Sequence, residues 1–242
     1  MLNIFSRKKS LIKTDFFNDF TDFHSHILPS VDDGVKSLES AISILDYYES
    51  IGIKRVVFTP HIMENFSDNC SDYLKSEFKK FTHNFSGNIE LSLAAEYMLD
   101  SGFYHHLESG KILTVWDNYI LIETSYLLPP INLFDAIKDI KSKGYFIVLA
   151  HPERYGYMRE DDLLLLKQEG VLFQLNLLSL TNYYGEMVQK RAIFLLENDM
   201  YNIIGSDIHN LEIFKRWIEQ VCLKPKHIKI LQKLKKNNIC VE

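Results

Sequence analysis

Residues 21–26, Thr21-Asp22-Phe23-His24-Ser25-His26, close a strand-like run just ahead of Val31-Asp32-Asp33-Gly34. Side chains two residues apart on a strand point to the same side, so both imidazoles of this His-x-His pair face one point. Neutral imidazole is a good ligand for first-row transition metals. Because single histidines are also common at surfaces and caps, the meaning of the pair depends on what recurs down the chain.

Acidic residues and further histidines follow most of the other strand-like runs. We predict seven strands, at residues 20–24, 54–59, 90–95, 119–123, 146–150, 172–176 and 202–205. The candidate metal ligands after them are His24, His26, Asp33, His61, Glu96, Glu123, His151, Asp207 and His209. One such residue is explained by a hydrogen-bonded turn, but nine at one repeated position predict a shared site, since buried polar groups need partners. The other histidines, His83, His105, His106 and His227, are expected at the surface.

Helix-period stretches separate the predicted strands, at residues 38–50, 133–143, 161–169 and 187–197. Ser37 is a candidate N-cap, and Gly52 and Gly144 are candidate C-cap glycines. This alternation predicts an α/β fold with a parallel sheet covered by helices. Seven strands in an undivided chain favour a closed or nearly closed barrel, although a doubly wound open sheet gives a similar pattern. In a barrel the carboxyl ends of the strands converge on one face.

Bulk properties narrow the class of protein. The chain has 242 residues, 46% of them hydrophobic, and a net charge of −5, which argues against nucleic acid as a partner. Three scattered cysteines predict no disulfide framework, and neither a signal peptide nor a membrane span is expected, so the cytoplasm is the predicted location. The basic tract at 7–13, with Leu2, Ile4, Phe5, Leu11 and Ile12, is expected to be a solvated tail, with peripheral contact to an anionic membrane as the alternative.

The charges of the candidate ligands favour several metals over one. Four carboxylates contribute four negative charges while the histidines are neutral ligands. One divalent ion would leave the site negative, whereas three would make it positive and suited to a phosphate ester. Metals in such a site activate water and neutralise the charge that develops on the phosphoryl group.

With these motifs in place, the chain resembles the PHP (polymerase and histidinol phosphatase) family of phosphoesterases with three metals. Residues 22–34, Asp22-Phe23-His24-Ser25-His26-Ile27-Leu28-Pro29-Ser30-Val31-Asp32-Asp33-Gly34, are similar to the motif of capsule-operon tyrosine phosphatases of the CpsB/YwqE type. The resemblance implies a distorted (β/α)7 TIM-like barrel. It also implies a PHP phosphoesterase domain over 21–242, preceded by an N-terminal extension over 1–20.

The same resemblance implies a ligand set for each of three divalent ions. The sets are His24, His26, Glu96 and Asp207; Glu96, Glu123 and His151; and Asp33, His61 and His209. Manganese is expected, with Fe, Zn or Co as alternatives. The implied activity is that of a metal-dependent protein-tyrosine phosphatase, and the implied partner is a phosphotyrosine protein, a bacterial tyrosine kinase of polysaccharide export.

Catalytic roles are expected for Arg154, Asp207 and His209. Arg154 is the candidate phosphate ligand, because its planar fork binds phosphate through two hydrogen bonds. Lys215 or Arg216 is expected to assist, although their register differs from that of relatives. Asn176 is either a support for the site or a core amide. Residues expected to line the entry, or simply to cover the barrel rim, are Tyr97, Tyr126, Tyr155 and Tyr183.

Other classes of protein fit the sequence less well. A cysteine-based phosphatase is excluded, because no cysteine is followed six positions later by arginine. A histidinol phosphatase, or another PHP phosphatase of small monoesters, would use the same metals and is the alternative enzyme. Amidohydrolases also begin with His-x-His, but they usually carry a lysine where this chain has Glu123. A metal-containing scaffold of a polysaccharide assembly complex is the alternative without catalysis.

Overall fold

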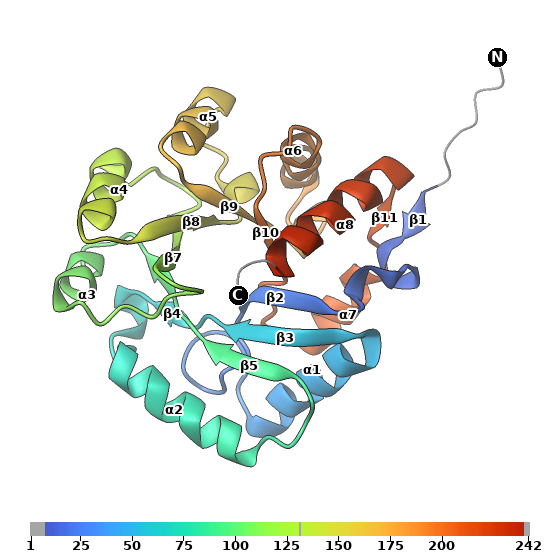
Figure 1. Ribbon diagram of the computed structural model, residues 1–242, viewed down its shortest axis with the longest axis horizontal. Coiled ribbons are helices and arrows are strands. Elements are labelled where there is room, and N and C mark those ends of the chain that lie inside the picture. The colour runs from blue at the N-terminus through green and yellow to red at the C-terminus, as the bar shows by residue number, and fades with distance from the viewer. Residues whose placement is uncertain (1–7, 131, 240–242) are drawn as a thin grey trace.

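Parallel strands line the centre of the molecule, and helices surround them (Figure 1). The computed structural model describes residues 8–130 and 132–239. Its strands are β1 (Lys9–Ser10), β2 (Phe20–Ser25), β3 (Ile53–Phe58), β4 (His61–Ile62), β5 (Glu90–Leu93), β6 (Glu96–Met98), β7 (Tyr119–Glu123), β8 (Phe146–Ala150), β9 (Leu172–Asn176), β10 (Ile203–Gly205) and β11 (Cys222–Leu223). Its α-helices are α1 (Leu38–Ile51), α2 (Ser71–Asn84), α3 (Phe103–Ser109), α4 (Leu133–Ser142), α5 (Glu160–Gln168), α6 (Glu186–Glu197), α7 (Leu211–Ile218) and α8 (Pro225–Ile239).

Nine of these strands form two parallel sheets, in the orders β10-β9-β8-β7-β6-β4 and β2-β3-β5. The chain passes from the smaller sheet to the larger one twice, between β3 and β4 and between β5 and β6. Pro60 stands at the first crossing, where its missing N–H favours a break in the ladder. The strand predicted over 90–95 is confirmed as β5, but it ends at Leu93, and Glu96 begins β6 directly opposite His61 of β4.

The first and last central strands, β2 and β10, lie side by side and join the two sheets (Figure 1). The amide of Asp207 donates to the carbonyl of His24 at 2.8 Å, and the amide of His26 donates to that of Ile208 at 3.0 Å. Gly205 permits this approach, because a Cβ there would lie 2.4 Å from the Cβ of His24. The result is a mixed α/β fold with a curled arrangement of parallel strands, which confirms the predicted α/β class.

Helix ends follow the sequence signals closely. The Ser37 hydroxyl accepts from the amide of Ser40, and Gly52 ends α1 with a φ of 99°. Gly144 lies one residue past the C-cap of α4 and also has positive φ. The sequence analysis contained no prediction for α2, α3, α7 and α8. Helix α2 buries only Ser71, Leu74 and Phe81, whereas the short helix α7 buries Phe214 and Ile218.

Residues 9–18 pack onto the central domain. Strand β1 pairs with β11, and the side chains of Leu11, Phe16 and Phe17 are buried in the main core. Because Leu11 faces the core, the described part of the basic tract offers little apolar surface to a membrane. Leu2, Ile4, Phe5 and Arg7 lie outside the described residues. Within those residues, no helix combines the length and the apolar character that a membrane span requires.

Candidate metal and active site

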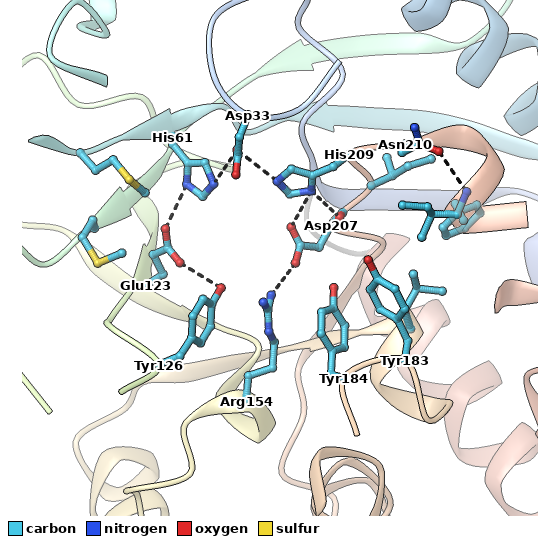
Figure 2. Close-up of a pocket in the computed structure, with 16 residues that line it drawn as sticks. Asp33, His61, Glu123, Tyr126, Arg154, Tyr183, Tyr184, Asp207, His209 and Asn210 are labelled. Carbon is cyan, nitrogen blue, oxygen red and sulfur yellow. Dashed lines mark hydrogen bonds and ion pairs between the residues drawn. The ribbon is translucent and has the colours of Figure 1, made fainter. Parts of the chain in front are cut away.

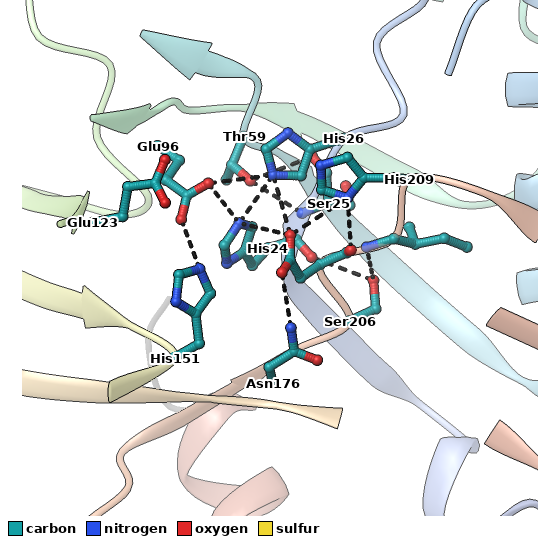
Figure 3. A network of polar contacts seen from close by, with 12 residues as sticks. His24, Ser25, His26, Thr59, Glu96, Glu123, His151, Asn176, Ser206 and His209 are labelled. Atoms are coloured by element: carbon teal, nitrogen blue, oxygen red, sulfur yellow. Dashed lines mark hydrogen bonds and ion pairs between the residues drawn. The ribbon is translucent and has the colours of Figure 1, made fainter. Parts of the chain in front are cut away.

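All nine candidate metal ligands come together at one end of the central strands, where β2, β7, β8 and β10 end and β4 and β6 begin (Figures 2 and 3). They are His24 and His26 of β2, Asp33 of the following loop, His61 of β4, Glu96 of β6, Glu123 of β7, His151 after β8, and Asp207 and His209 after β10. Most of the side chains are buried. The exceptions are Asp33, with 62% of its side chain exposed, and His209, with 32%, which gives the cluster one open side.

Four overlapping groups of side chains place their donor atoms within 4.8 Å of one another. The groups are His26, Asp33, His61 and His209; His24, His26 and Asp207; His61, Glu96 and Glu123; and His24, Glu96 and His151. The first contains the whole expected set of Asp33, His61 and His209. Glu96 belongs to two groups, as expected for a bridging ligand. The grouping of Glu123 differs from expectation, because it meets Glu96 beside His61 rather than beside His151.

The donor set fits divalent metal ions. The Nε2 atoms of His24 and His26 lie 3.1 Å apart, a close approach of two like groups that a shared cation would explain. Four buried donor atoms of the cluster form no hydrogen bond of good geometry: Nδ1 of His61, Oε2 of Glu96, Oε1 of Glu123 and Nδ1 of His151. Three of them face one another, since Nδ1 of His61 lies 3.2 Å from Oε2 of Glu96 and 3.0 Å from Oε1 of Glu123. Buried polar atoms are nearly always satisfied, so orphaned ones require an explanation. Mixed imidazole and carboxylate donors suit Mn, Fe, Zn or Co.

Electrostatics also favours cations in the cluster. Burial disfavours the charged imidazole of His24, but the carboxylates of Glu96 and Asp207 outweigh it and raise its pKa to about 9. Burial also disfavours the charged form of Glu96 and would raise its pKa. His24 and the hydrogen bond from His151 nevertheless hold the pKa of Glu96 well below its usual range. Without metals, a proton on His24 thus helps to balance the carboxylates of Glu96 and Asp207. A divalent ion replaces that proton when it binds.

Hydrogen bonds behind the ligands fix the orientation of the imidazoles. Nδ1 of His26 donates to Asp32 at 2.8 Å, and Nδ1 of His24 donates to Gln174 at 3.0 Å. Both rings therefore direct Nε2 toward the cluster, as supporting residues of metal sites commonly arrange. Asp32 also accepts from the amides of Gly34 and His61. The sequence analysis missed this role of Asp32, although the Asp-Asp-Gly spelling was a usable signal.

Gly34 lets its loop close over the ligand pair. A Cβ at this position would lie 2.3 Å from the carbonyl oxygen of His26 and 2.6 Å from its Cβ. Real Cβ atoms do not approach other atoms so closely, and both obstacles belong to a buried residue. Glycine is therefore required here for close packing rather than for an unusual backbone angle.

Two candidate ligands have left-handed backbones, which non-glycine residues rarely adopt. The φ of His151 is 35° and that of Asp207 is 54°. Such conformations cost free energy and cluster at functional sites. Asp207 divides its two oxygens between partners: Oδ1 lies 3.5 Å and 3.4 Å from Nε2 of His24 and His26. Its Oδ2 accepts from Asn176 at 2.8 Å, which assigns this amide to the support of the site.

Arg154 lies at the edge of a cavity of about 300 Å³ that opens from the cluster (Figure 2). Its Nη1 donates to Oδ2 of Asp207 at 2.9 Å. Its guanidinium carbon lies 4.1 Å from the ring centroid of Tyr126 and 4.2 Å from that of Tyr184. Two aromatic faces thus hold one cation, a favourable arrangement. Tyr183 and Tyr184 both line the cavity. Tyr183 was expected there from the sequence, and Tyr184 was not.

Several sequence expectations do not hold in the structure. Lys215 and Arg216 lie outside the cavity lining, which α7 reaches through Ile213 and Phe214. Because successive residues of a helix point in different directions, Lys215 and Arg216 do not share the cavity face of α7. The Lys215 ammonium lies 4.9 Å from the ring centroid of Tyr47. Tyr97 and Tyr155 are fully buried, so neither lines the entry.

His227, expected at the surface, is buried. Its Nε2 lies 2.6 Å from the carboxylate of Glu197, so it packs between α6 and α8. The pattern of a single sequence carried no signal for this contact, because the two helices meet only in the folded chain.

The family model for capsular polysaccharide synthesis proteins of the CpsB/CapC type matches residues 20–228. Tyrosine-protein phosphatase CpsB of Streptococcus pneumoniae is 28% identical over 212 residues, which cover 82% of this chain and 86% of that protein. Tyrosine-protein phosphatase YwqE of Bacillus subtilis (strain 168) is 29% identical over 204 residues, which cover 79% and 78% of the two chains. Putative tyrosine-protein phosphatase CapC of Staphylococcus aureus is 26% identical over 196 residues, covering 78% and 77%.

Solved structures share the fold. One comes from a pair of crystal structures, YwqE from Bacillus subtilis and CpsB from Streptococcus pneumoniae, described as metal-dependent tyrosine phosphatases. It superposes with a TM-score of 0.70 and 24% identity over 88% of this chain and 86% of its own. A phosphotriesterase homology protein from Escherichia coli gives 0.53 and 10% identity over 91% and 97%. The family model spans all nine candidate ligands, and the chain belongs to the CpsB/CapC family of capsular polysaccharide synthesis proteins.

Proposed function

We propose that the protein is a metal-dependent protein-tyrosine phosphatase. The observation that carries the proposal is the position of Arg154, which shares Asp207 with the ligand cluster at the edge of an aromatic-lined cavity. An arginine beside metal ions can bind the negatively charged phosphoryl group of a substrate. The tyrosine rings of the cavity can pack against the phenyl ring of a phosphotyrosine. The relatives named tyrosine phosphatases support the same activity.

The nine ligands would hold three divalent ions, with manganese as the expected metal. Bound there, the metals would supply an activated water and positive charge for the phosphoryl oxygens. The overlapping ligand groups and the orphaned donor atoms support more than one ion. The three buried carboxylates of Glu96, Glu123 and Asp207, together with the exposed Asp33, also require more than a single divalent charge to balance them.

The protein's own residues bind and orient the substrate. Arg154 would hold two phosphoryl oxygens, with its plane fixed by Tyr126 and Tyr184. Asp207 orients Arg154 through one oxygen and serves the metals through the other, and His209 stands at the half-open mouth of the cluster. The burial of His24 and Glu96 excludes water from the far side, which strengthens every charge interaction inside.

The substrate in this proposal is a phosphotyrosine protein, in particular a tyrosine kinase of polysaccharide export, in the cytoplasm. Family membership in capsular polysaccharide synthesis supports this choice. Both cysteines that the structure describes, Cys70 and Cys222, are free thiols, which suits a reducing compartment.

The architecture proposed for this activity is a distorted (β/α)7 barrel over residues 21–242, the PHP phosphoesterase domain. The contact between β2 and β10 supports closure, and the strand positions β2, β3–β4, β5–β6, β7, β8, β9 and β10 would supply the seven units. Residues 1–20 would form the extension before it, of which the part from Lys9 onward packs against the domain.

Turnover of a phosphotyrosyl peptide, compared with histidinol phosphate and p-nitrophenyl phosphate, tests the proposal directly. The peptide should be hydrolysed with the highest kcat/KM, and a chelator should abolish all three activities. Faster hydrolysis of histidinol phosphate than of any phosphotyrosyl peptide would assign the protein to the small-molecule phosphatases. No hydrolysis by the manganese-loaded protein would contradict phosphatase function altogether.

A further inference from the structure

A second, larger groove of about 660 Å³ adjoins the cavity beside Arg154. It lies between α3 and the segment that joins β7 to α4, which are neighbours in the outer layer (Figure 1). Met63 and Met98 line both hollows, so the groove borders the candidate active site at these two side chains. A ligand that fills the cavity can therefore extend into the groove across the two methionines.

The floor and one wall of the groove are apolar. We use the name flanking groove for the surface made by Met63, Met98, Phe103, Tyr104, Leu128 and Pro129. Phe103 is buried, but Tyr104 is 40% exposed and Leu128 is 71% exposed. Large apolar side chains left open beside a candidate active site indicate a binding surface, since a water-facing patch gains from being covered. Methionines suit this role because their flexible side chains adapt to different partners.

Two carboxylates edge the flanking groove. Asp100 accepts from the amides of Glu64, Gly102 and Phe103, so it is held rigidly. The carboxylate of Glu64 accepts from the hydroxyl of Ser101. Among residues 8–130 and 132–239, no lysine or arginine forms an ion pair with either acid. The edge is thus negative and has no cation of its own, so it complements a basic residue on a ligand.

The cavity accommodates little beyond one phosphorylated side chain. Its volume of about 300 Å³ is at the lower end of the range for small-molecule pockets. The peptide on either side of a bound phosphotyrosine must lie outside it, and the flanking groove is the adjoining hollow that shares two lining residues with it.

We propose that the flanking groove binds the peptide segment next to the phosphotyrosine and selects substrates that carry an apolar residue and a lysine or arginine on the same side of the phosphotyrosine. This inference rests on the proposed phosphatase function and extends it from the phosphoryl group to the surrounding sequence. The apolar side chain covers Met98, Phe103 and Leu128, and the basic residue lies beside Glu64 and Asp100. The groove therefore determines which phosphotyrosines are hydrolysed and not how the bond breaks.

The test compares kcat/KM for phosphotyrosyl peptides that carry Leu or Ser, and Lys or Glu, at each of the three positions on either side of the phosphotyrosine. On one side, leucine should be preferred over serine by roughly tenfold, the discrimination expected from an apolar pocket. Lysine should be preferred over glutamate by roughly twofold to fivefold, as for an exposed ion pair. Turnover of p-nitrophenyl phosphate, which has no flanking residues, is measured in parallel.

Variants locate the preference in the groove. Leu128→Ser should remove most of the preference for leucine, whereas the matched control Leu127→Ser, 86% exposed and outside the groove lining, should retain it. Glu64→Lys should remove the preference for lysine, and Glu64→Gln, which keeps an acceptor for Ser101, should only weaken it, because the carboxylate of Asp100 remains in both variants. All four variants should hydrolyse p-nitrophenyl phosphate at the wild-type rate.

Each outcome separates the two levels of the proposal. Equal kcat/KM for all peptides with intact p-nitrophenyl phosphate turnover would overturn the groove assignment alone. Equal loss of discrimination in Leu127→Ser and Leu128→Ser would overturn it as well. A wild-type protein that hydrolyses neither peptides nor p-nitrophenyl phosphate would overturn the phosphatase function, and the groove assignment with it.

Discussion

Arg154 and Asp207 lie 2.9 Å apart, with Nη1 of the arginine donating to Oδ2 of the aspartate. The other oxygen of Asp207 faces the imidazoles of the metal cluster. One carboxylate therefore links the group that would bind phosphate to the groups that would bind metals. Arg154 is positioned only when the strand ends that form the cluster are in place, so the site assembles as a unit.

Replacing Arg154 by alanine should lower kcat/KM on a phosphotyrosyl peptide by roughly ten- to a thousandfold, the loss of one charge-assisted contact that strengthens in the transition state. Bound metal, measured by elemental analysis, should not change. Arg216→Ala is the matched control, because Arg216 is exposed and outside the cavity. An equal loss in both variants would contradict the role given to Arg154.

Tyr184 should act by positioning Arg154. Tyr184→Ala removes one of the two rings beside the guanidinium and should raise KM for the peptide roughly threefold to tenfold, in line with a cation–π contact. Tyr184→Phe keeps the ring and should restore most of the binding. If phenylalanine is no better than alanine, the hydroxyl contact to Asn176 matters more than the ring.

Removal of metals should destabilise the fold. The carboxylates of the emptied cluster repel one another or take up protons. Metals that bind only the native state stabilise it by mass action. A chelator should therefore lower Tm at pH 7, and added manganese should restore it. His151→Ala should show a smaller chelator-dependent shift than the wild type. An unchanged Tm, with metal loss verified by elemental analysis, would argue against a preformed cluster.

Gly34→Ala should disturb the cluster from behind. The added Cβ meets the backbone and Cβ of His26, and relief of such overpacking costs roughly 1–3 kcal/mol. We expect a lower free energy of unfolding and reduced metal content, both measurable on the purified protein. Gly156→Ala is the control, because a Cβ there meets nothing within 4 Å. Wild-type metal content in Gly34→Ala would show that the loop around Gly34 can move away from His26 without disturbing the cluster.

Glu197 should contribute a pH-dependent part of stability. Hydrogen bonds with Lys226 and His227 lower the pKa of this carboxyl from 4.5 to about 2. A depressed folded-state pKa stabilises the protein above the unfolded-state value, and that contribution disappears as the pH falls from about 4.5 toward 2. The difference in Tm between wild type and Glu197→Gln should therefore be larger at pH 6 than at pH 3. A difference that grows on acidification would contradict this assignment.

The ligand positions could be predicted from sequence because strand ends are a local signal. An apolar run followed by histidine or a carboxylate is visible in the sequence, and all nine residues found in this way meet in one cluster. Alternation of strands and helices likewise predicted the α/β fold. Short strands gave weaker signals: β4 and β6 span two and three residues, too few for a period, so the change of sheet beside His61 and Glu96 was missed.

Contacts between distant segments could not be predicted from sequence. Nothing near Tyr184 indicates that its ring lies on Arg154, because the loops that carry them meet only through packing of β8 and β9. Lys215 and Arg216 are the reverse case, because they were expected beside the phosphate and lie outside the cavity lining. Their charge made them candidates for phosphate, but the orientation of α7 depends on Phe214 and Ile218, which are buried in the core.

The junction of β2 with β10 also has a consequence for biosynthesis. His24 and His26 are translated before Asp207 and His209, and the other candidate ligands lie between the two pairs in the chain. Backbone hydrogen bonds across the junction, and with them the complete ligand set, exist only after the last central strand has emerged. Ligands that come together only in the folded chain make metal uptake a late event. A nascent or prematurely terminated chain that ends before Asp207 would therefore lack two of the nine candidate ligands and the junction that brings them to the others.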